Sequence, residues 1–240
     1  GGTPEGIPTL TYEGYLDEHR RHYQLSNSYT VLYGDLDIER ALAWLDKRYF
    51  TPVHEEELRN QEERREAGAD PLLPRAIETQ APVCNLGLTK TMRTAPENAV
   101  AGAGFVIGDA SQRTRVMATD ILLDALFGSN EAPMKRAMLD SGIAEDVSAF
   151  VADAMKQPFV VIQLKKQQDE TAADLVPTIE REITKLLDAG LSKDLIEAAI
   201  SHEEFVMREH DFGLADGVAH AMNCLAGWLY DDSLATTYLR

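Results

Sequence analysis

Two histidines and several glutamates lie close together in the segment HEEFVMREH, from His202 to His210, and these residue types could bind zinc. Zinc hydrolases of one kind place two histidine ligands and a general-base glutamate on one helix, as H-E-x-x-H or as its inversion H-x-x-E-H. Both patterns require a second histidine at position 206, which is Val206 here. On one straight helix His202 and His210 would be roughly 12 Å apart, at about 1.5 Å per residue. Two nitrogens bound to one zinc lie only about 4 Å apart, so these histidines cannot share an ion.

A second candidate group is formed by Glu18, His19 and His22 near the beginning of the chain. Glu18 and His22 are one helical turn apart and could supply two ligands to a metal ion. A catalytic zinc site needs three protein ligands and an activated water, and the sequence offers no obvious third ligand. His19 also falls on a tyrosine-rich helical stripe, which favours a histidine in a core or at an interface.

We therefore interpret His202 and His210 as partly buried histidines that pack inside the fold. From the residues alone we predict no catalytic residue, no metal ligand and no cofactor in this chain. The abundance of carboxylates favours no particular pair, so the substrate-binding residues stay unknown. An independent metal enzyme that uses His202 or His19 is a disfavoured alternative.

Fragments of other motifs occur, but their context excludes the usual function. Gly102, Gly104 and Gly108 imitate a phosphate loop, yet they lie inside an apolar, strand-like run and do not open a helix. The A-P-E at 95–97 precedes the D-F-G at 211–213, which reverses the order in protein kinases, and there is no H-R-D. No G-x-S-x-G serine motif is present.

Composition limits the partners. A net charge of −17 repels phosphate backbones and anionic lipid surfaces, so we expect neither nucleic acid nor membrane as a partner.

Cys84 and Cys224 are far apart in the sequence and form no C-x-x-C, so a thiolate zinc site is not supported. We predict that Cys84 packs as a buried thiol. We expect a cytoplasmic protein, and a start without initiator Met or signal-peptide core suggests an excerpt of a longer chain.

Hydrophobic periodicity predicts the elements that position these residues. Helical spacing covers 10–23, 38–50, 112–127, 131–141 and the region from Asp174 to the end, and strand-like alternation covers 29–33, 82–93, 98–108, 145–153 and 158–166. Residues 51–81 are highly charged and are predicted to form a solvated connector with at most one helical piece. Strand pairs followed by helices predict an α+β fold, a two-layer sandwich of mostly antiparallel sheet covered by helices, as one domain over residues 1–240.

The helix from Asp174 has the clearest pattern. Its predicted apolar stripe consists of Val176, Ile179, Ile183, Leu186 and Leu187. Gly190 follows at the position where a left-handed C-terminal cap is expected.

Three long phrases carry a family resemblance. They are GGTPEGIPTLTYEGYLDEHRRHYQLSNSYTVLYGDLD, LFGSNEAPMKRAMLDSGIAEDV and EFVMREHDFGLADGVAHAMNCLAGWLYDD. In this order they resemble segments of pitrilysin-like zinc metallopeptidases of the presequence-protease branch. The sequence departs from the family where Gln24-Leu25 replaces His-Pro and where Ala132-Pro133-Met134 replaces Ser-Pro-Leu, and both departures fall at turns.

The resemblance implies a function for the chain. In such peptidases an H-x-x-E-H helix of the first domain and a later glutamate hold the zinc. This chain resembles the second, metal-free domain, which walls the chamber where unfolded peptides are cut. It implies zinc in the parent enzyme but none in this segment, with the remaining domains and peptide substrates as partners. The alternative is a non-peptidase scaffold of the same fold.

The chain should then carry a docking surface for the metal-binding domain. Aromatic residues gather in the first helix and strand, namely Tyr12, Tyr15, Tyr23, Tyr29 and Tyr33. Tyrosine is enriched at interfaces because it combines an apolar ring with a polar tip. Such a surface can also pair two copies into a weak homodimer.

Overall fold

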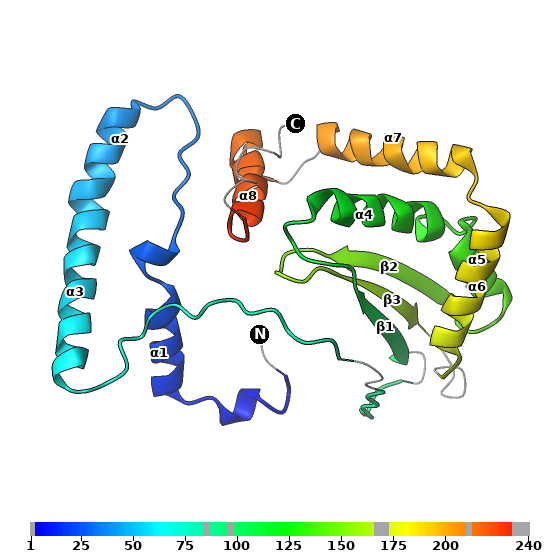
Figure 1. Cartoon of the computed structure of the whole chain (residues 1–240), viewed down its shortest axis with the longest axis horizontal. Coiled ribbons are helices and arrows are strands. Elements are labelled where there is room, and N and C mark those ends of the chain that lie inside the picture. The colour runs from blue at the N-terminus through cyan, green and yellow to red at the C-terminus, as the bar shows by residue number, and fades with distance from the viewer. Residues whose placement is uncertain (1–2, 84–86, 96–97, 166–172, 210–212, 232–240) are drawn as a thin grey trace. The chain divides into compact units, whose positions relative to one another are not determined.

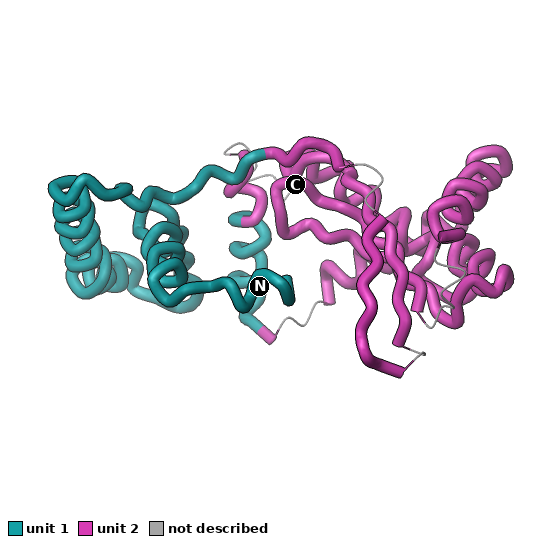
Figure 2. Tube along the Cα trace, turned by 90° about the horizontal axis from the view of Figure 1, so that it is seen from below, with its two compact units in different colours: residues 1–78, 214–225 teal, residues 79–213, 226–240 magenta. Residues whose placement is uncertain are grey.

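The computed structural model describes residues 3–83, 87–95, 98–165, 173–209 and 213–231 (Figure 1). The chain divides into two compact units (Figure 2). Unit 1 comprises residues 1–78 and 214–225, and unit 2 comprises residues 79–213 and 226–240. The single domain expected over residues 1–240 is not tested by this division and stays a prediction.

Unit 2 is built around a three-stranded antiparallel sheet with the strand order β1-β3-β2. The strands are β1 (Val100–Val106), β2 (Asp146–Ala152) and β3 (Phe159–Lys165). β3 lies in the middle, where Val160 pairs with Phe105 on one side and with Val151 on the other. Val160, Ile162 and Leu164 alternate along β3 and are buried, as expected for a strand with one face on the core.

Helices cover this sheet. They are α4 (Arg113–Phe127), α5 (Pro133–Asp140), α6 (Leu175–Ala189) and α7 (Lys193–Glu209). α4 and α5 contact β2, α6 contacts β1, and α7 contacts α4. Figure 1 shows α4 along one face of the sheet, with α7 on the outer side of α4. The predicted α+β sandwich of an antiparallel sheet covered by helices is confirmed.

The hydrophobic core of unit 2 lies between the sheet and the helices α4 to α6. It consists of Leu123, Leu126, Phe127, Met134, Met138, Ile143, Val147, Val160, Ile162, Leu164, Leu175 and Ile179. Met138, Val147 and Leu164 each expose 0% of their surface. Because burial of apolar surface is the main favourable term in folding, this core stabilises unit 2 and fixes the position of its helices.

Helix boundaries in unit 2 follow local chemistry. Pro133 begins α5, where its missing N–H leaves no helical hydrogen bond unmade. α6 ends at Gly190, whose N–H donates to the carbonyl of Leu186 at 2.9 Å. Gly190 has a φ of +76°, so the predicted capping position is confirmed, but its ψ of 157° is extended in place of left-handed helical.

The buried face of α6 differs from the predicted stripe. The buried residues of this helix are Leu175, Thr178, Ile179 and Glu182. Leu187, which belongs to the predicted stripe, is 78% exposed. Glu182 can occupy the buried face because Lys185 and Arg181 donate hydrogen bonds to its carboxylate at 2.8 and 3.0 Å. The bond from Lys185 is the main cause that lowers the pKa of Glu182.

Unit 1 is helical. Thr11 caps α1 (Tyr12–His22) by accepting the N–H of Gly14 at 3.1 Å, and Asp37 caps α2 (Ile38–Leu45) by accepting the N–H of Arg40 at 3.0 Å. α2 continues through a π-helical turn, η3 (Asp46–Phe50), into α3 (Thr51–Glu66). The 3₁₀ turns η1 (Ile7–Thr9) and η2 (Leu25–Asn27) flank α1, and α8 (Asp216–Trp228) begins in unit 1.

Some predicted elements change in the structure. The helix predicted over 38–50 extends to residue 66, so the first half of the charged region 51–81 is helical. The strands predicted over 29–33 and 82–93 are wrong for the described residues, which form no strand there, and residues 84–86 lie outside the description. Alternation specifies only a pattern of side chains, whereas a strand also needs a hydrogen-bonded neighbour. β1 finds that neighbour in β3.

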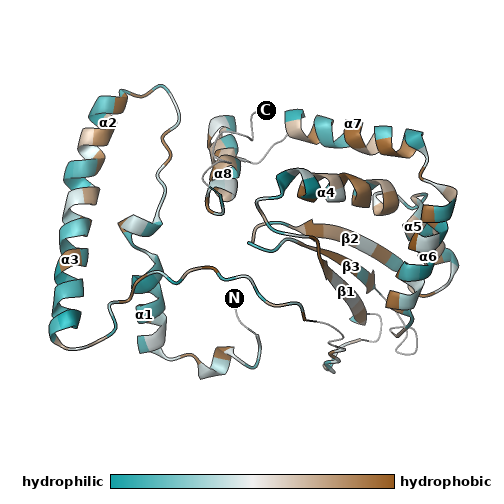
Figure 3. Ribbon diagram, in the orientation of Figure 1, coloured by the Kyte–Doolittle hydropathy of each residue, from teal (hydrophilic) through white to brown (hydrophobic). Residues whose placement is uncertain are grey.

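Apolar side chains are distributed differently in the two units. Figure 3 shows hydrophobic colour along the strands and mostly hydrophilic colour along α3. Among the described residues of unit 1, Gln24, Leu72 and Ala219 are buried. Three such residues are too few for a hydrophobic core. Polar contacts between α1, α3 and the segment that follows α3 therefore hold much of unit 1 together.

Candidate functional site

Helices α4 and α7 bring together polar side chains that lie far apart in the sequence. Nδ1 of His202 on α7 is 3.0 Å from Oδ2 of Asp124 on α4. Asp120 precedes Asp124 by one helical turn, so both lie on one face of α4. Glu203 follows His202 on α7. We call these four residues the α4–α7 polar cluster.

The carboxylates of this cluster perturb one another. Burial raises the pKa of Asp120, and the negative charges of Asp153 and Asp124 raise it further. Burial also raises the pKa of Glu203, and the negative charge of Asp120 raises this pKa further. Both causes disfavour an ionised carboxylate, so Asp120 and Glu203 hold a proton more readily in the folded chain than in water.

His202 is more accessible than predicted. Its side chain is 61% exposed, so the expectation of a partly buried packing residue is wrong. The imidazole instead lies at the surface beside Asp124, because α7 packs on α4 and not directly on the sheet. His210 lies outside the described residues. Spacing along the chain gave no signal for Asp124, the partner from another helix.

The group Glu18, His19 and His22 is engaged within unit 1. Glu18 Oε1 is 2.8 Å from Nη2 of Arg75, and Glu18 Oε2 is 3.5 Å from Nε2 of His22. The ring of His19 stacks on Tyr23, with 4.2 Å between centroids and 11° between planes. A carboxylate that pairs with an arginine is a poor candidate for a metal ligand, and the sequence did not reveal this pairing because Arg75 is distant in the chain.

Zinc does not fit these groups. Within the described ranges, no three His, Cys, Asp or Glu side chains are grouped so that they could hold a metal ion. Zinc in proteins takes at least three such ligands. That the whole chain contains no metal ligand stays a prediction.

The remaining motif residues lie in β1, on α8 or outside the described residues. Gly102 and Gly104 lie within β1 and pair with Gln163 and Val161 of β3, which confirms that they belong to a strand. Cys224 is a free, half-buried cysteine on α8. Cys84, residues 96–97 of the A-P-E and residues 211–212 of the D-F-G lie outside the described residues.

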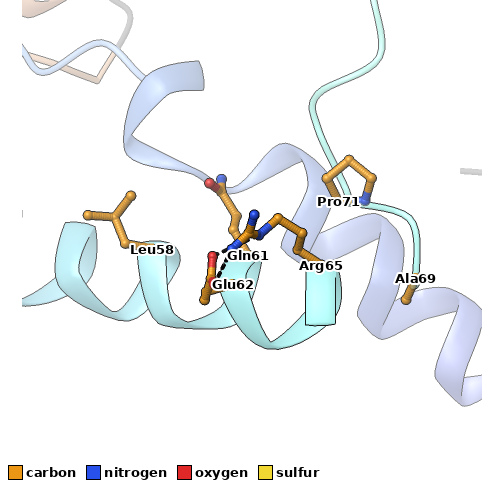
Figure 4. A pocket seen from close by; sticks show the side chains of 6 residues that line it. All are labelled: Leu58, Gln61, Glu62, Arg65, Ala69 and Pro71. Atoms are coloured by element: carbon orange, nitrogen blue, oxygen red, sulfur yellow. Dashed lines mark hydrogen bonds and ion pairs between the residues drawn. The ribbon is translucent and has the colours of Figure 1, made fainter. Parts of the chain in front are cut away.

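A shallow pocket of about 420 Å³ lies in unit 1. Figure 4 shows its lining residues on α3 and the segment that follows it, namely Leu58, Gln61, Glu62, Arg65, Ala69 and Pro71. Its two charged side chains, Glu62 and Arg65, form an ion pair with each other. The lining offers neither a nucleophile nor an unpaired carboxylate, so this pocket has no catalytic constellation.

Replacing His202 with Gln is expected to change the free energy of unfolding by less than about 1 kcal/mol, because exposed ion pairs contribute little. Urea denaturation at pH 7 measures this change. The matched control is His54→Gln, which alters an exposed histidine on α3. A loss above about 2 kcal/mol for His202→Gln alone would contradict the surface role, since losses of that size come from buried interactions.

Replacing Asp120 with Asn is expected to raise the melting temperature at pH 7. The pKa of Asp120 is raised above the value of 3.8 for the free side chain, so its protonated form favours the folded state. That stabilisation is complete below the unfolded pKa and is lost as the pH rises through the folded pKa. Asn removes the charge at every pH, so the gain should shrink as the pH falls toward 4.

Thermal melts at pH 7 and pH 4.5 test this prediction. Asp188→Asn, which neutralises an exposed carboxylate on α6, is the control for net charge. A lower melting temperature at pH 7, or a gain equal at both pH values, would show that Asp120 does not carry an unfavourable charge.

Unit 2 thus combines an antiparallel sheet with covering helices, and the described candidate histidines contact a carboxylate or an aromatic ring of the same chain. Residues 9–202 match the family model described as the peptidase M16 inactive domain. The chain belongs to this family.

Similar proteins agree with this membership. The chain is 28% identical to Protein HypA of Clostridium perfringens over 96% of this chain and 23% of that protein. It is 26% identical to Presequence protease 1, chloroplastic/mitochondrial, of Arabidopsis thaliana over 96% of this chain and 21% of that protein. It therefore spans less than a quarter of these relatives. A crystal structure described as an M16-like peptidase from Alicyclobacillus acidocaldarius has the same fold, with 18% identity, a TM-score of 0.51, and coverage of 99% of this chain and 54% of that one.

Within the described ranges, the structure has no helix with the length and apolar character needed to cross a membrane.

Proposed function

We propose that this chain forms part of the wall of a peptide-degrading chamber in a zinc endopeptidase, where it contributes no zinc ligand and no catalytic residue. The observation that carries the proposal is the match of residues 9–202 to an inactive peptidase domain. Relatives that are named presequence proteases and are far longer than this chain support it. In this proposal, the zinc and the general base belong to another domain with an H-x-x-E-H helix.

The arrangement of polar groups supports a non-catalytic role. His202 is paired with Asp124, and Glu18 is paired with Arg75. Arginine pairing makes Glu18 a poor general base, and His202, although Asp124 could orient it, lies in no group of three described side chains that could hold a metal ion. Within the described residues, the candidate groups of this chain serve its own architecture.

The tyrosines of unit 1 support a docking surface for the metal-binding domain. Tyr12, Tyr15 and Tyr23 on and after α1 expose 74%, 62% and 77% of their surface, and Tyr29 and Tyr33 expose 46% and 57%. Large exposed aromatic residues are typical of a surface that is covered in an assembly. We propose that the remaining domains of the parent enzyme cover these rings. The same rings would pair two free copies into a weak homodimer.

For the parent enzyme we propose a location in the cytoplasm.

The test reconstitutes the enzyme from two pieces. The chain alone, dialysed against trace zinc, is expected to hold no stoichiometric zinc and to cleave no quenched-fluorescence peptide. A separately expressed segment with the H-x-x-E-H helix is then added. We expect a stable complex and restored cleavage of unstructured peptides.

The controls separate docking from folding. Tyr12→Ser with Tyr15→Ser should weaken the complex, whereas Tyr49→Ser on η3, which alters a tyrosine that is 52% exposed, should not. One tightly bound zinc per chain would contradict the metal-free role. A complex that forms but never cleaves peptides would favour the scaffold alternative, and the absence of a complex between folded pieces would contradict docking.

A further inference from the structure

One segment of unit 1 is held by polar side chains in place of apolar packing. The chain that leaves α3 runs back across α1 between Ala69 and Arg75, and we call these residues the strap. Arg21 Nη1 donates to the carbonyl of Leu73 at 3.1 Å, and Arg21 Nη2 donates to Oδ2 of Asp70 at 2.8 Å. The guanidinium of Arg21 therefore binds the Asp70 side chain and the Leu73 backbone carbonyl of the strap.

Neighbouring contacts also hold the strap. Gln24 Nε2 donates to the carbonyl of Leu72 at 2.8 Å, and the glutamine is 9% exposed. Arg64 Nε on α3 donates to the carbonyl of Asp70 at 2.6 Å. Arg75 pairs with Glu18 of α1 at 2.8 Å. α1, α3 and Gln24 thus hold the strap through donors of their own, and Glu18 of α1 accepts from Arg75 of the strap.

The backbone of the strap is strained where these contacts hold it. Leu72 has a φ of +54°, a left-handed conformation that is unfavourable for a residue with a Cβ. Its side chain is nevertheless only 5% exposed, and its N–H donates to Oδ1 of Asp70 at 3.3 Å. The docked conformation therefore opposes local strain with hydrogen bonds, ion pairs and one buried leucine.

We propose that the strap is a releasable segment, held in place chiefly by Arg21, that detaches from α1 and α3 while unit 2 stays folded. Two of the contacts that hold it, Arg21–Asp70 and Arg75–Glu18, are ion pairs whose carboxylates are solvent-accessible, and salt weakens such pairs, whereas the core of unit 2 is apolar. In the Arg21–Asp70 ion pair, the side chain of Asp70 is 58% exposed and that of Arg21 is 11% exposed. Water therefore reaches this ion pair at the carboxylate of Asp70.

The test measures hydrogen–deuterium exchange of the whole chain, resolved to the amides of Ala69 and Leu72, which donate to the Arg64 carbonyl and to Asp70 Oδ1, and, as an internal reference, to β3. Arg21→Gln is expected to speed exchange in the strap by about fivefold or more, with β3 unchanged. Arg20→Gln is the matched control, because Arg20 lies on the same helix but pairs with Asp17 of α1 itself. Raising sodium chloride from 50 mM to 1 M should speed strap exchange more in the wild type than in Arg21→Gln.

A second variant guards against misfolding. Asp70→Asn keeps the shape of the side chain but removes its charge, so it should speed strap exchange and reduce the salt effect. Equal strap exchange in the wild type and Arg21→Gln would overturn the proposal. So would an equal effect of Arg20→Gln, or faster exchange of β3 together with the strap, because the strap would then have no opening of its own.

Discussion

Replacing Leu164 with Ala is expected to lower the free energy of unfolding by about 3 kcal/mol, within the range of 2–5 kcal/mol for leucines in cores. Leu164 exposes 0% of its surface and lies on β3, the strand that pairs with both neighbours. Removing the side chain takes away apolar burial and leaves a cavity where the sheet meets the helices. Urea denaturation, followed by far-ultraviolet circular dichroism, measures the loss.

Leu187→Ala is the matched control for Leu164→Ala. Leu187 belongs to the apolar stripe predicted from the sequence, yet the structure leaves it 78% exposed on α6. Surface substitutions usually change stability by no more than about 0.5 kcal/mol. Equal losses for the two variants would mean that α6 buries the predicted face, and the assignment of the core would be wrong.

Elements whose signal is local were predicted well. The strands of the β2–β3 hairpin and the helices α1, α4, α5 and α6 lie close to their expected positions. Helical periodicity specifies such helices, and alternation specifies a strand where a hydrogen-bonded neighbour is also present. Pro133 and Gly190 marked a beginning and an end because proline and glycine restrict or release the backbone.

Features that depend on distant residues were not predictable from spacing. The partner of β1 is β3, although 82–93 is closer in sequence. The carboxylates of Asp124 and Glu18 meet His202 and Arg75 across long stretches of chain. The buried face of α6 turned toward Glu182 because two cations stabilise that carboxylate, and a hydrophobicity pattern cannot represent a paired charge.

Replacing Gly190 with Ala is expected to lower the free energy of unfolding by about 1–3 kcal/mol. Gly190 combines a φ of +76° with a ψ of 157°, a region that is essentially restricted to glycine. An added Cβ would meet no atom within 4 Å, so the loss would come from the backbone alone. Urea denaturation measures this loss.

Gly87→Ala is the control for Gly190→Ala. An added Cβ at Gly87 also meets nothing within 4 Å, and Gly87 has no positive φ. Alanine there should leave stability unchanged or raise it by up to about 1 kcal/mol, because it restricts the unfolded chain.

Gly190 lies just before α7, so a strained cap should also disturb the packing of α7 on α4. Faster amide exchange around His202 in Gly190→Ala, but not in Gly87→Ala, would confirm that this glycine positions the α4–α7 polar cluster, and unchanged exchange would contradict it.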